Sequence, residues 1–261
     1  MAQRLGGHFA DFNLFQAQYL SGRVALFLDV DGTLLEIARR PDAVRVTEPL
    51  KALLGSLLTD NRGAVALVSG RTLDGLDALF APPAFPAAGL HGVERRSASG
   101  IIHRRDFGAA LHPVREMLSA HSCDGLLVED KGGAIVLHYR EHPELEDRAL
   151  RLAEQAVRLA GAAWSVVPGK MSFELRVAHV GKHQALEDFM NEPPFAGRIP
   201  AFFGDDVTDE PGFEYVNAHD GWSVHIGSGP SAARRSLPDP LAVWRLLRAL
   251  HPHHAHEVSA T

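Results

Sequence analysis

The chain has 261 residues with 46% hydrophobic and 22% charged side chains, a composition typical of a globular protein with a substantial core. Its 26 basic and 32 acidic residues give a net charge of -6, which argues against nucleic acid as the main partner. With one cysteine, Cys123, the chain cannot form an internal disulfide, and we expect a cytoplasmic protein.

The two ends of the chain predict neither a leader nor a membrane anchor. Residues 1–23 lack a continuous apolar run and contain Asp11, so we expect no signal peptide. No stretch approaches the roughly 18 apolar residues of a membrane span. We interpret the histidine-rich ending HPHHAHEVSAT as a solvated terminus rather than a metal site, and Cys123 as a small, partly buried side chain.

Strand and helix signals alternate over the first hundred residues. The apolar run 24–30 predicts a buried strand, and leucines at helical spacing predict a helix over 46–60 with Thr47 at its N-cap. A second strand (63–71), a helix (71–80) and a third strand with its turn (84–94) follow. This order predicts a parallel sheet with helices on both faces.

The middle of the chain, from about Ile101 to Val177, has a different pattern. Two apolar runs around a Gly-Gly pair predict an antiparallel hairpin over 125–140. Helices are expected near 109–121 and 144–161, and further strands at 164–170 and 171–177. We interpret this part as an α+β segment inserted into the first domain.

After the insertion the α/β pattern returns. A helix opens at Gly181-Lys182, strands are expected in 199–210 and 222–227, and a helix with proline at its start closes the fold at 238–250. The predicted fold is therefore a Rossmann-like α/β core, residues 1–103 and 177–261, with an inserted α+β cap over 104–176.

Polar residues follow the predicted parallel strands where each strand ends. In an open parallel sheet ligands bind at the carboxyl ends of the strands, so these residues are expected to meet in one pocket together with Lys182. The strand-end segments are Asp29-Val30-Asp31-Gly32-Thr33, Ser69-Gly70-Arg71, Gly89-Leu90-His91-Gly92 and Gly204-Asp205-Asp206-Val207-Thr208-Asp209.

These residue types suit phosphoryl transfer. Clustered carboxylates bind a hard cation such as Mg²⁺, and the cation with a lysine neutralises a phosphoryl group. One aspartate can then attack phosphorus while a second acid, two residues on, protonates the leaving oxygen. Taken one at a time, such acids are better explained as turn residues or helix caps, and it is their coincidence at several strand ends that favours a site.

The ordered set of motifs resembles that of the haloacid dehalogenase superfamily: DxDGT at Asp29, then Ser69, Lys182 and the GDDVTD segment. The likeness extends to trehalose-6-phosphate phosphatases over roughly residues 20–250. It is carried by SGR (69–71), GLHG (89–92), EDKG (129–132), HYR (138–140), GK (169–170) with Glu174, GK (181–182) and GDDVTDE (204–210). Departures from that family are confined to Pro211 and Ser231.

The resemblance implies a role for each residue of the predicted core site. Asp29 would be the nucleophile that forms an aspartyl-phosphate, and Asp31 the general acid and then the base. Ser69 and Lys182 would hold the transferring phosphoryl group. The implied Mg²⁺ ligands are Asp29, the carbonyl of Asp31, Asp205 and Asp206, with Thr33 and Asp209 supporting them.

The inserted segment is expected to recognise the sugar. A disaccharide needs side chains that donate and accept several hydrogen bonds. The resemblance implies that Glu129, Lys131, Arg140, Lys170 and Glu174 bind it, although the pattern alone favours a solvated, ion-paired sheet face. Arg71 and His91 are added as substrate contacts, with a loop-holding role kept open for His91.

The implied function is Mg²⁺-dependent hydrolysis of trehalose 6-phosphate by a monomer, with a functional link to the synthase that makes this substrate. Two alternatives stay open. One is a phosphatase for another sugar phosphate, such as sucrose phosphate or a mannosyl-phosphoglycerate. The other is an inactive regulatory relative, which would be expected to have lost Asp29, Asp31, Lys182 or Asp205; all four are present.

Overall fold

The computed structural model describes residues 11–37, 45–104, 108–120, 125–178 and 180–251. The chain divides into two compact units. Residues 1–103 and 181–261 form the first unit, and residues 104–180 form the second.

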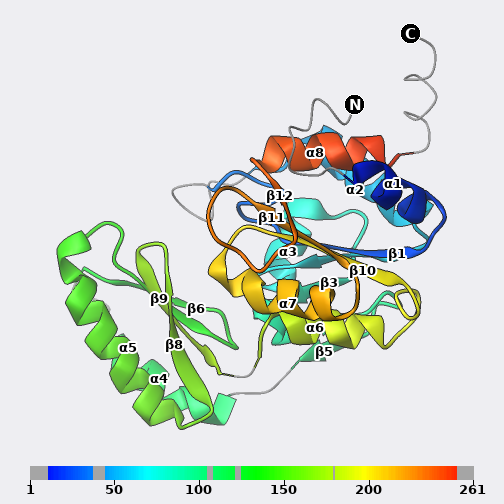
Figure 1. Ribbon diagram of the computed structural model, residues 1–261. Coiled ribbons are helices and arrows are strands. Elements are labelled where there is room, and N and C mark those ends of the chain that lie inside the picture. Colours follow the sequence, from blue (N-terminus) through cyan, green and yellow to red (C-terminus); the bar gives the residue numbers. More distant parts are fainter. Residues whose placement is uncertain (1–10, 38–44, 105–107, 121–124, 179, 252–261) are drawn as a thin grey trace. The chain divides into compact units, whose positions relative to one another are not determined.

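The first unit is built on an eight-stranded sheet in the order β12-β11-β10-β1-β2-β3-β4-β5 (Figure 1). All pairings from β12 to β3 are parallel, and β4 runs antiparallel to β3. The strands are β1 (Val24–Leu28), β2 (Val65–Val68), β3 (Ala87–Gly89), β4 (Glu94–Arg96), β5 (Ile102–Arg104), β10 (Ile199–Gly204), β11 (Trp222–Ile226) and β12 (Arg235–Leu237).

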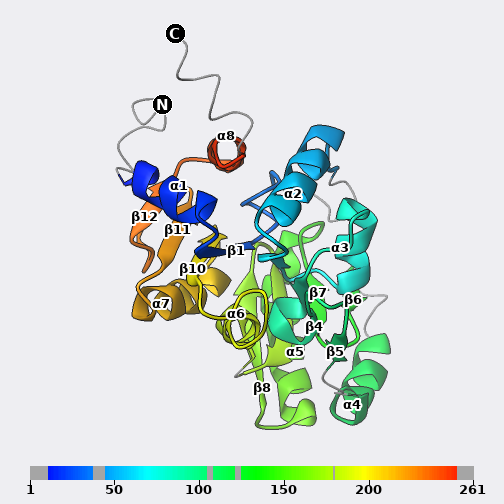
Figure 2. The same cartoon turned by 90° about the vertical axis from the view of Figure 1, so that its right-hand side faces the viewer.

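Helices cover both faces of this sheet because its central strands are apolar on both sides. Leu26 and Leu28 of β1 belong to a core cluster with α1 (Phe12–Leu20), α2 (Glu48–Asp60), α3 (Leu73–Phe80) and α8 (Pro240–Ala249). The alternate residues Ala25 and Phe27 pack with α6 (Lys182–Met190) and α7 (Glu210–Ala218) on the other face. Figure 2 shows α6 and α7 apart from α2, α3 and α8.

The second unit is a four-stranded antiparallel sheet, in the order β6-β7-β9-β8, with two helices. The elements are α4 (Gly108–Ser119), β6 (Leu127–Asp130), β7 (Ile135–His138), α5 (Glu146–Ala160), β8 (Trp164–Gly169) and β9 (Ser172–Val177). Ile135, Leu137 and Leu175 pack with the helices in one core. Because side chains alternate along a strand, the residues that alternate with these core positions, such as Val136 and His138 of β7, lie on the opposite face of the sheet. This face is called here the open face.

The α/β fold expected from the sequence is confirmed, with corrections at the sheet edges. The expected start of the inserted segment at residue 104 falls on the last residue of β5, a strand that neighbours β4 in the large sheet. The sequence reading also missed α1, β4 and β12. Thr47 lies at the N-cap position of α2 as predicted, although its side chain makes no capping hydrogen bond.

Some predictions fall on parts of the chain that the structure does not describe. Cys123, residues 1–10 and the histidine-rich residues 252–261 lie outside the described residues. Across the described ranges, none of the helices combines the length and apolar character needed to cross a membrane.

Candidate active site

Three of the predicted site residues follow neighbouring strands of the first unit, and a fourth opens a helix. Asp29 extends β1, where its amide donates to the carbonyl of Phe203 at 2.9 Å. Ser69 follows β2, and Asp205 follows β10. Lys182 is the first residue of α6 and is buried.

A buried lysine joins two buried carboxylates at this edge of the sheet. Nζ of Lys182 donates to Oδ1 of Asp29 and to Oδ1 of Asp209, each at 2.6 Å. Lys182 is 3% exposed and Asp209 is fully buried, so both ion pairs are shielded from water. Burial of charge is costly unless the charges are paired in this way.

The electrostatics of this group stabilise the charged form of Lys182 and raise the pKa of Asp29. Burial raises the pKa of the Asp29 carboxyl well above its ordinary value; Lys182 opposes the shift, while Asp209 and Asp205 add to it. Burial lowers the pKa of Lys182, but Asp209 and Asp29 outweigh that effect and keep the pKa above its ordinary value. Further positive charge beside Asp29 would lower the pKa of its carboxyl.

Two glycines leave space for the side chains of Asp205 and Asp209. Gly32 has a φ of +92°, and a Cβ atom there would overlap the Asp205 carboxylate. A Cβ at Gly204 would likewise overlap the side chain of Asp209. Glycine is thus required at both positions for the carboxylates to approach the backbone so closely.

Asp209 organises the loop after β10. Its Oδ2 accepts the amides of Asp205 at 3.1 Å and Asp206 at 3.0 Å, while its Oδ1 accepts from Lys182. Both carboxylate oxygens are therefore already hydrogen-bonded. Asp209 fits a supporting role better than that of a cation ligand.

The acids present suit a divalent cation. One oxygen from each of Asp29, Asp205 and Asp209 lies within 4.8 Å of the others. Three carboxylates against one ammonium leave two negative charges, which a divalent ion would neutralise. Oxygen donors are those that Mg²⁺ prefers. The predicted ligand Asp206 lies outside this group: its Oδ1 accepts the amide of Val207 at 2.7 Å and caps the 3₁₀ turn Val207–Asp209 (η5).

Asp31 is held by Arg71, a pairing that the sequence did not reveal. Nε of Arg71 donates to Oδ2 of Asp31 at 2.7 Å, and Nη2 donates to Oδ1 at 2.6 Å. The backbone amide of Arg71 donates to Oγ of Ser69 at 3.1 Å. Arg71, which is expected to contact substrate, links two other predicted site residues in the structure, Asp31 and Ser69.

His91 lies in a left-handed turn that supports the loop after β2. Leu90 and His91 have φ values of 50° and 55°, which L-residues seldom adopt. The amide of His91 donates to the carbonyl of Ser69 at 2.9 Å, and that of Leu90 to the carbonyl of Arg71 at 2.8 Å. These contacts favour the loop-holding role for His91. Thr33 is also buried, and its hydroxyl has no hydrogen-bond partner among the described residues.

The residues expected to recognise the sugar lie in the second unit. Strand register aligns Glu129 of β6, Val136 of β7 and Glu174 of β9 in one row across the sheet. Oε2 of Glu129 is hydrogen-bonded to Nε2 of His138 at 2.9 Å. That hydrogen bond is the main reason why the pKa of Glu129 lies below its ordinary value, with a smaller contribution from Lys131.

The other three predicted sugar contacts are at turns. Lys131 follows β6, and its amide donates to the carbonyl of Ala134 at 2.9 Å. Arg140 donates from Nη2 to the carbonyl of Lys170 at 3.0 Å, which ties the end of β7 to the β8–β9 turn. His138 was not among the predicted site residues, although it opens the HYR motif and its pairing partner, Leu127, is two residues from Glu129.

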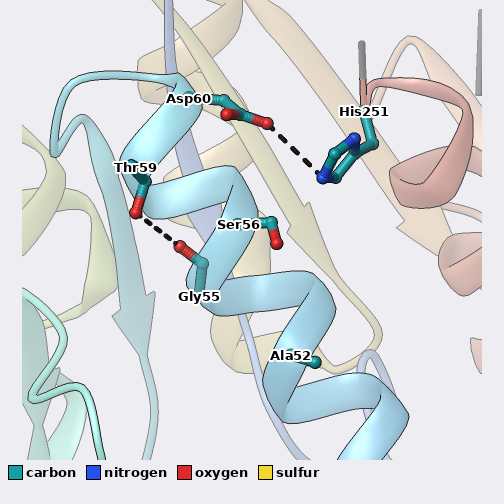
Figure 3. Close-up of a pocket in the computed structure, with 6 residues that line it drawn as sticks. All are labelled: Ala52, Gly55, Ser56, Thr59, Asp60 and His251. Atoms are coloured by element: carbon teal, nitrogen blue, oxygen red, sulfur yellow. Dashed lines mark hydrogen bonds and ion pairs between the residues drawn. The ribbon is translucent and has the colours of Figure 1, made fainter. Parts of the chain in front are cut away.

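A surface pocket on α2 is separate from these residues (Figure 3). It has a volume of about 420 Å³ and is lined by Ala52, Gly55, Ser56, Thr59, Asp60 and His251. Nε2 of His251 lies 3.7 Å from Oδ2 of Asp60. None of the predicted catalytic residues lines it.

In fold the chain is similar to BT1666 of Bacteroides thetaiotaomicron, named as a phosphatase of the haloalkanoate (HAD) enzyme superfamily, with a TM-score of 0.59, 17% identity and coverage of 88% and 94%. The family model "Trehalose-phosphatase" matches residues 27–240. The chain belongs to the trehalose-phosphatase family.

Named relatives agree with this assignment. The chain is 44% identical to a probable trehalose-phosphate phosphatase of Sinorhizobium fredii, over 87% of each chain. It is 40% identical to the trehalose-6-phosphate phosphatase of Escherichia coli, over 91% of this chain and 90% of the relative. In fold it is similar to the C-terminal domain of C. albicans trehalose-6-phosphate phosphatase, with a TM-score of 0.79, 20% identity and coverage of 92% and 97%.

Proposed function

We propose that the chain is a Mg²⁺-dependent phosphatase that hydrolyses trehalose 6-phosphate to trehalose and phosphate. The observation that carries the proposal is Lys182 held between Asp29 and Asp209 beside Asp205, in a chain 40–44% identical to named trehalose-phosphate phosphatases. This arrangement concentrates one ammonium and several carboxylates where a phosphoryl group needs charge balance.

In the first step an Asp29 oxygen bonds to phosphorus and the bond from phosphorus to the sugar oxygen breaks. The carboxylic acid of Asp31 gives its proton to that oxygen, so trehalose leaves as an alcohol. Lys182 and the Ser69 hydroxyl hold the phosphoryl oxygens. Proton transfer requires that Arg71 release one of the two Asp31 oxygens it binds.

In the second step the Asp31 carboxylate takes a proton from water, whose oxygen bonds to phosphorus. The bond between phosphorus and Asp29 breaks, which releases phosphate and restores both acids. A bound Mg²⁺, held by Asp29, the carbonyl of Asp31, and Asp205, would supply the positive charge that keeps Asp29 ionised and offsets phosphoryl charge. Asp206, Thr33 and Asp209 would support these ligands.

The open face of the second unit is proposed to recognise the sugar, which makes residues 104–176 the substrate-recognition cap. Glu129 and Glu174 would accept hydrogen bonds from trehalose hydroxyls, and Lys131, Arg140 and Lys170 would donate. Arg71, when released from Asp31, and His91 are further candidates for substrate contact. We also infer that the enzyme acts in the cytoplasm as a monomer, since one chain supplies every residue in this scheme, and that it works after trehalose-6-phosphate synthase.

The proposal predicts an activity that depends on Mg²⁺ and that is largely restricted to trehalose 6-phosphate. Phosphate release is measured from trehalose 6-phosphate, sucrose 6-phosphate and glucose 6-phosphate, with Mg²⁺ and then with excess chelator. We expect kcat/KM for trehalose 6-phosphate to exceed the others by about a hundredfold or more, because a site built for hydroxyls penalises substrates that leave its groups unpaired. Chelator should abolish release, and added Mg²⁺ should restore it. Comparable activity on all three substrates would contradict the sugar assignment, and chelator-resistant activity the metal assignment.

A further inference from the structure

The open face of the second unit holds one carboxylate in a defined position. Glu129 and His138 come from neighbouring antiparallel strands, and the register pairs His138 with Leu127, two residues from Glu129 on the same side of β6. Nε2 of His138 and Oε2 of Glu129 are 2.9 Å apart, a distance typical of a charge-assisted hydrogen bond. Since a carboxylate only accepts, Nε2 of His138 is the donor.

This contact leaves the other carboxylate oxygen available. Among the described residues, Oε1 of Glu129 has no hydrogen-bond partner, while Oε2 is bound to His138. The side chain of Glu129 is 39% exposed and that of His138 is 23% exposed. A glutamate this exposed would otherwise sample several rotamers, each of which costs entropy to select when a ligand binds.

We propose that His138 is a positioning residue for sugar specificity, which fixes the Glu129 carboxylate so that Oε1 meets a trehalose hydroxyl. This assignment rests on the proposed function. His138 acts through Glu129 and need not touch the sugar. It therefore contributes to binding of the disaccharide rather than to phosphoryl transfer.

A second His–Glu pair of this unit provides a contrast and a control. His112 and Glu116 are 3.6 Å apart on α4, and both side chains are more than 70% exposed. Their pairing is i,i+4 on a helix surface, where such contacts contribute little. His112→Ala therefore removes a histidine next to a glutamate without touching the open face.

The test compares His138→Ala, His138→Gln and His112→Ala on trehalose 6-phosphate and p-nitrophenyl phosphate, with thermal unfolding of each variant as a check on folding. We expect His138→Ala to lower kcat/KM for trehalose 6-phosphate by about ten- to a hundredfold, mainly through KM. The small substrate, which has no sugar hydroxyls, should be affected far less. His138→Gln should recover most of the loss, because its amide can donate to Glu129. His112→Ala should match the wild type.

A double-mutant cycle with Glu129→Ala separates the possible failures. If His138 acts through Glu129, the double variant should be no worse than Glu129→Ala alone. If Glu129→Ala impairs trehalose 6-phosphate hydrolysis and His138→Ala does not, the role of His138 is overturned and the proposed function stands. If His138→Ala lowered kcat/KM equally on trehalose 6-phosphate and on p-nitrophenyl phosphate, the role of His138 in sugar specificity would also be overturned. No release from trehalose 6-phosphate by the wild type would overturn the proposed function and this assignment together.

Discussion

Asp29→Asn should abolish phosphate release from trehalose 6-phosphate and from p-nitrophenyl phosphate alike. The amide cannot attack phosphorus, and loss of a covalent nucleophile costs about 10⁴-fold or more in kcat. The fold should be kept, because asparagine has nearly the same shape and still accepts a hydrogen bond from Lys182. Phosphate release and the circular dichroism spectrum are the two measurements.

A matched control is Asp60→Asn on α2, in the surface pocket of Figure 3. It makes the same chemical change at a partly exposed aspartate in the same unit, and full activity is expected. Release from either substrate by Asp29→Asn at more than a small fraction of the wild-type rate would rule out an aspartyl-phosphate at Asp29.

Lys182→Met should lose both stability and activity. Removal of one partner from a buried ion pair costs about 3–5 kcal/mol, because Asp29 and Asp209 remain buried beside each other without the ammonium. Urea unfolding of the metal-free protein measures this loss. Activity should fall on every substrate, since the phosphoryl group loses its lysine.

The stability of this variant should depend on pH in a defined direction. Burial raises the pKa of Asp29 in the folded state, and Lys182, which lowers it, is absent from the variant. The unfolded carboxyl titrates near pH 4, so above about pH 4 the unfolded state ionises first. The free energy of unfolding should then fall as pH rises until Asp29 ionises in the fold.

Lys51→Met serves as the comparison for Lys182→Met. Lys51 pairs with the exposed Glu48 at 3.4 Å on α2, and such surface pairs contribute about 1 kcal/mol or less. Adding Asp209→Asn to Lys182→Met should restore part of the lost stability by removing one uncompensated charge. If Lys182→Met lost no more free energy of unfolding than Lys51→Met, the claim that Lys182 stabilises two buried carboxylates would be contradicted.

Much of the core site could be predicted because its residues follow buried strands. The apolar runs before Asp29, Ser69 and Asp205 identify parallel strands, and the carboxyl ends of parallel strands meet at one edge. Lys182 was predicted by its position at the start of a helix. The structure places Lys182 between Asp29 and Asp209, within one hydrogen-bonded group.

The partners of these residues could not be predicted in the same way. Arg71 and Asp31 are 40 positions apart, and their ion pair depends on side-chain directions that no local pattern records. Whether Asp206 or Asp209 faces Asp29 depends on the η5 turn, in which Asp206 caps the backbone and Asp209 points inward. The three-residue strands β4 and β12 are too short for a period-2 pattern to be recognised.

The central claim is that Asp29 becomes phosphorylated, and it can be tested by trapping that intermediate. Asp31→Asn is mixed with p-nitrophenyl phosphate and Mg²⁺, because this leaving group needs no acid while the missing base slows hydrolysis of the intermediate. Borohydride reduces an acyl phosphate to an alcohol, so mass spectrometry of the tryptic peptide 24–39 should find homoserine at position 29. A burst of p-nitrophenol equal to the enzyme concentration should accompany it. Turnover by this variant with no modification at position 29, or with the modification at another residue, would contradict the account.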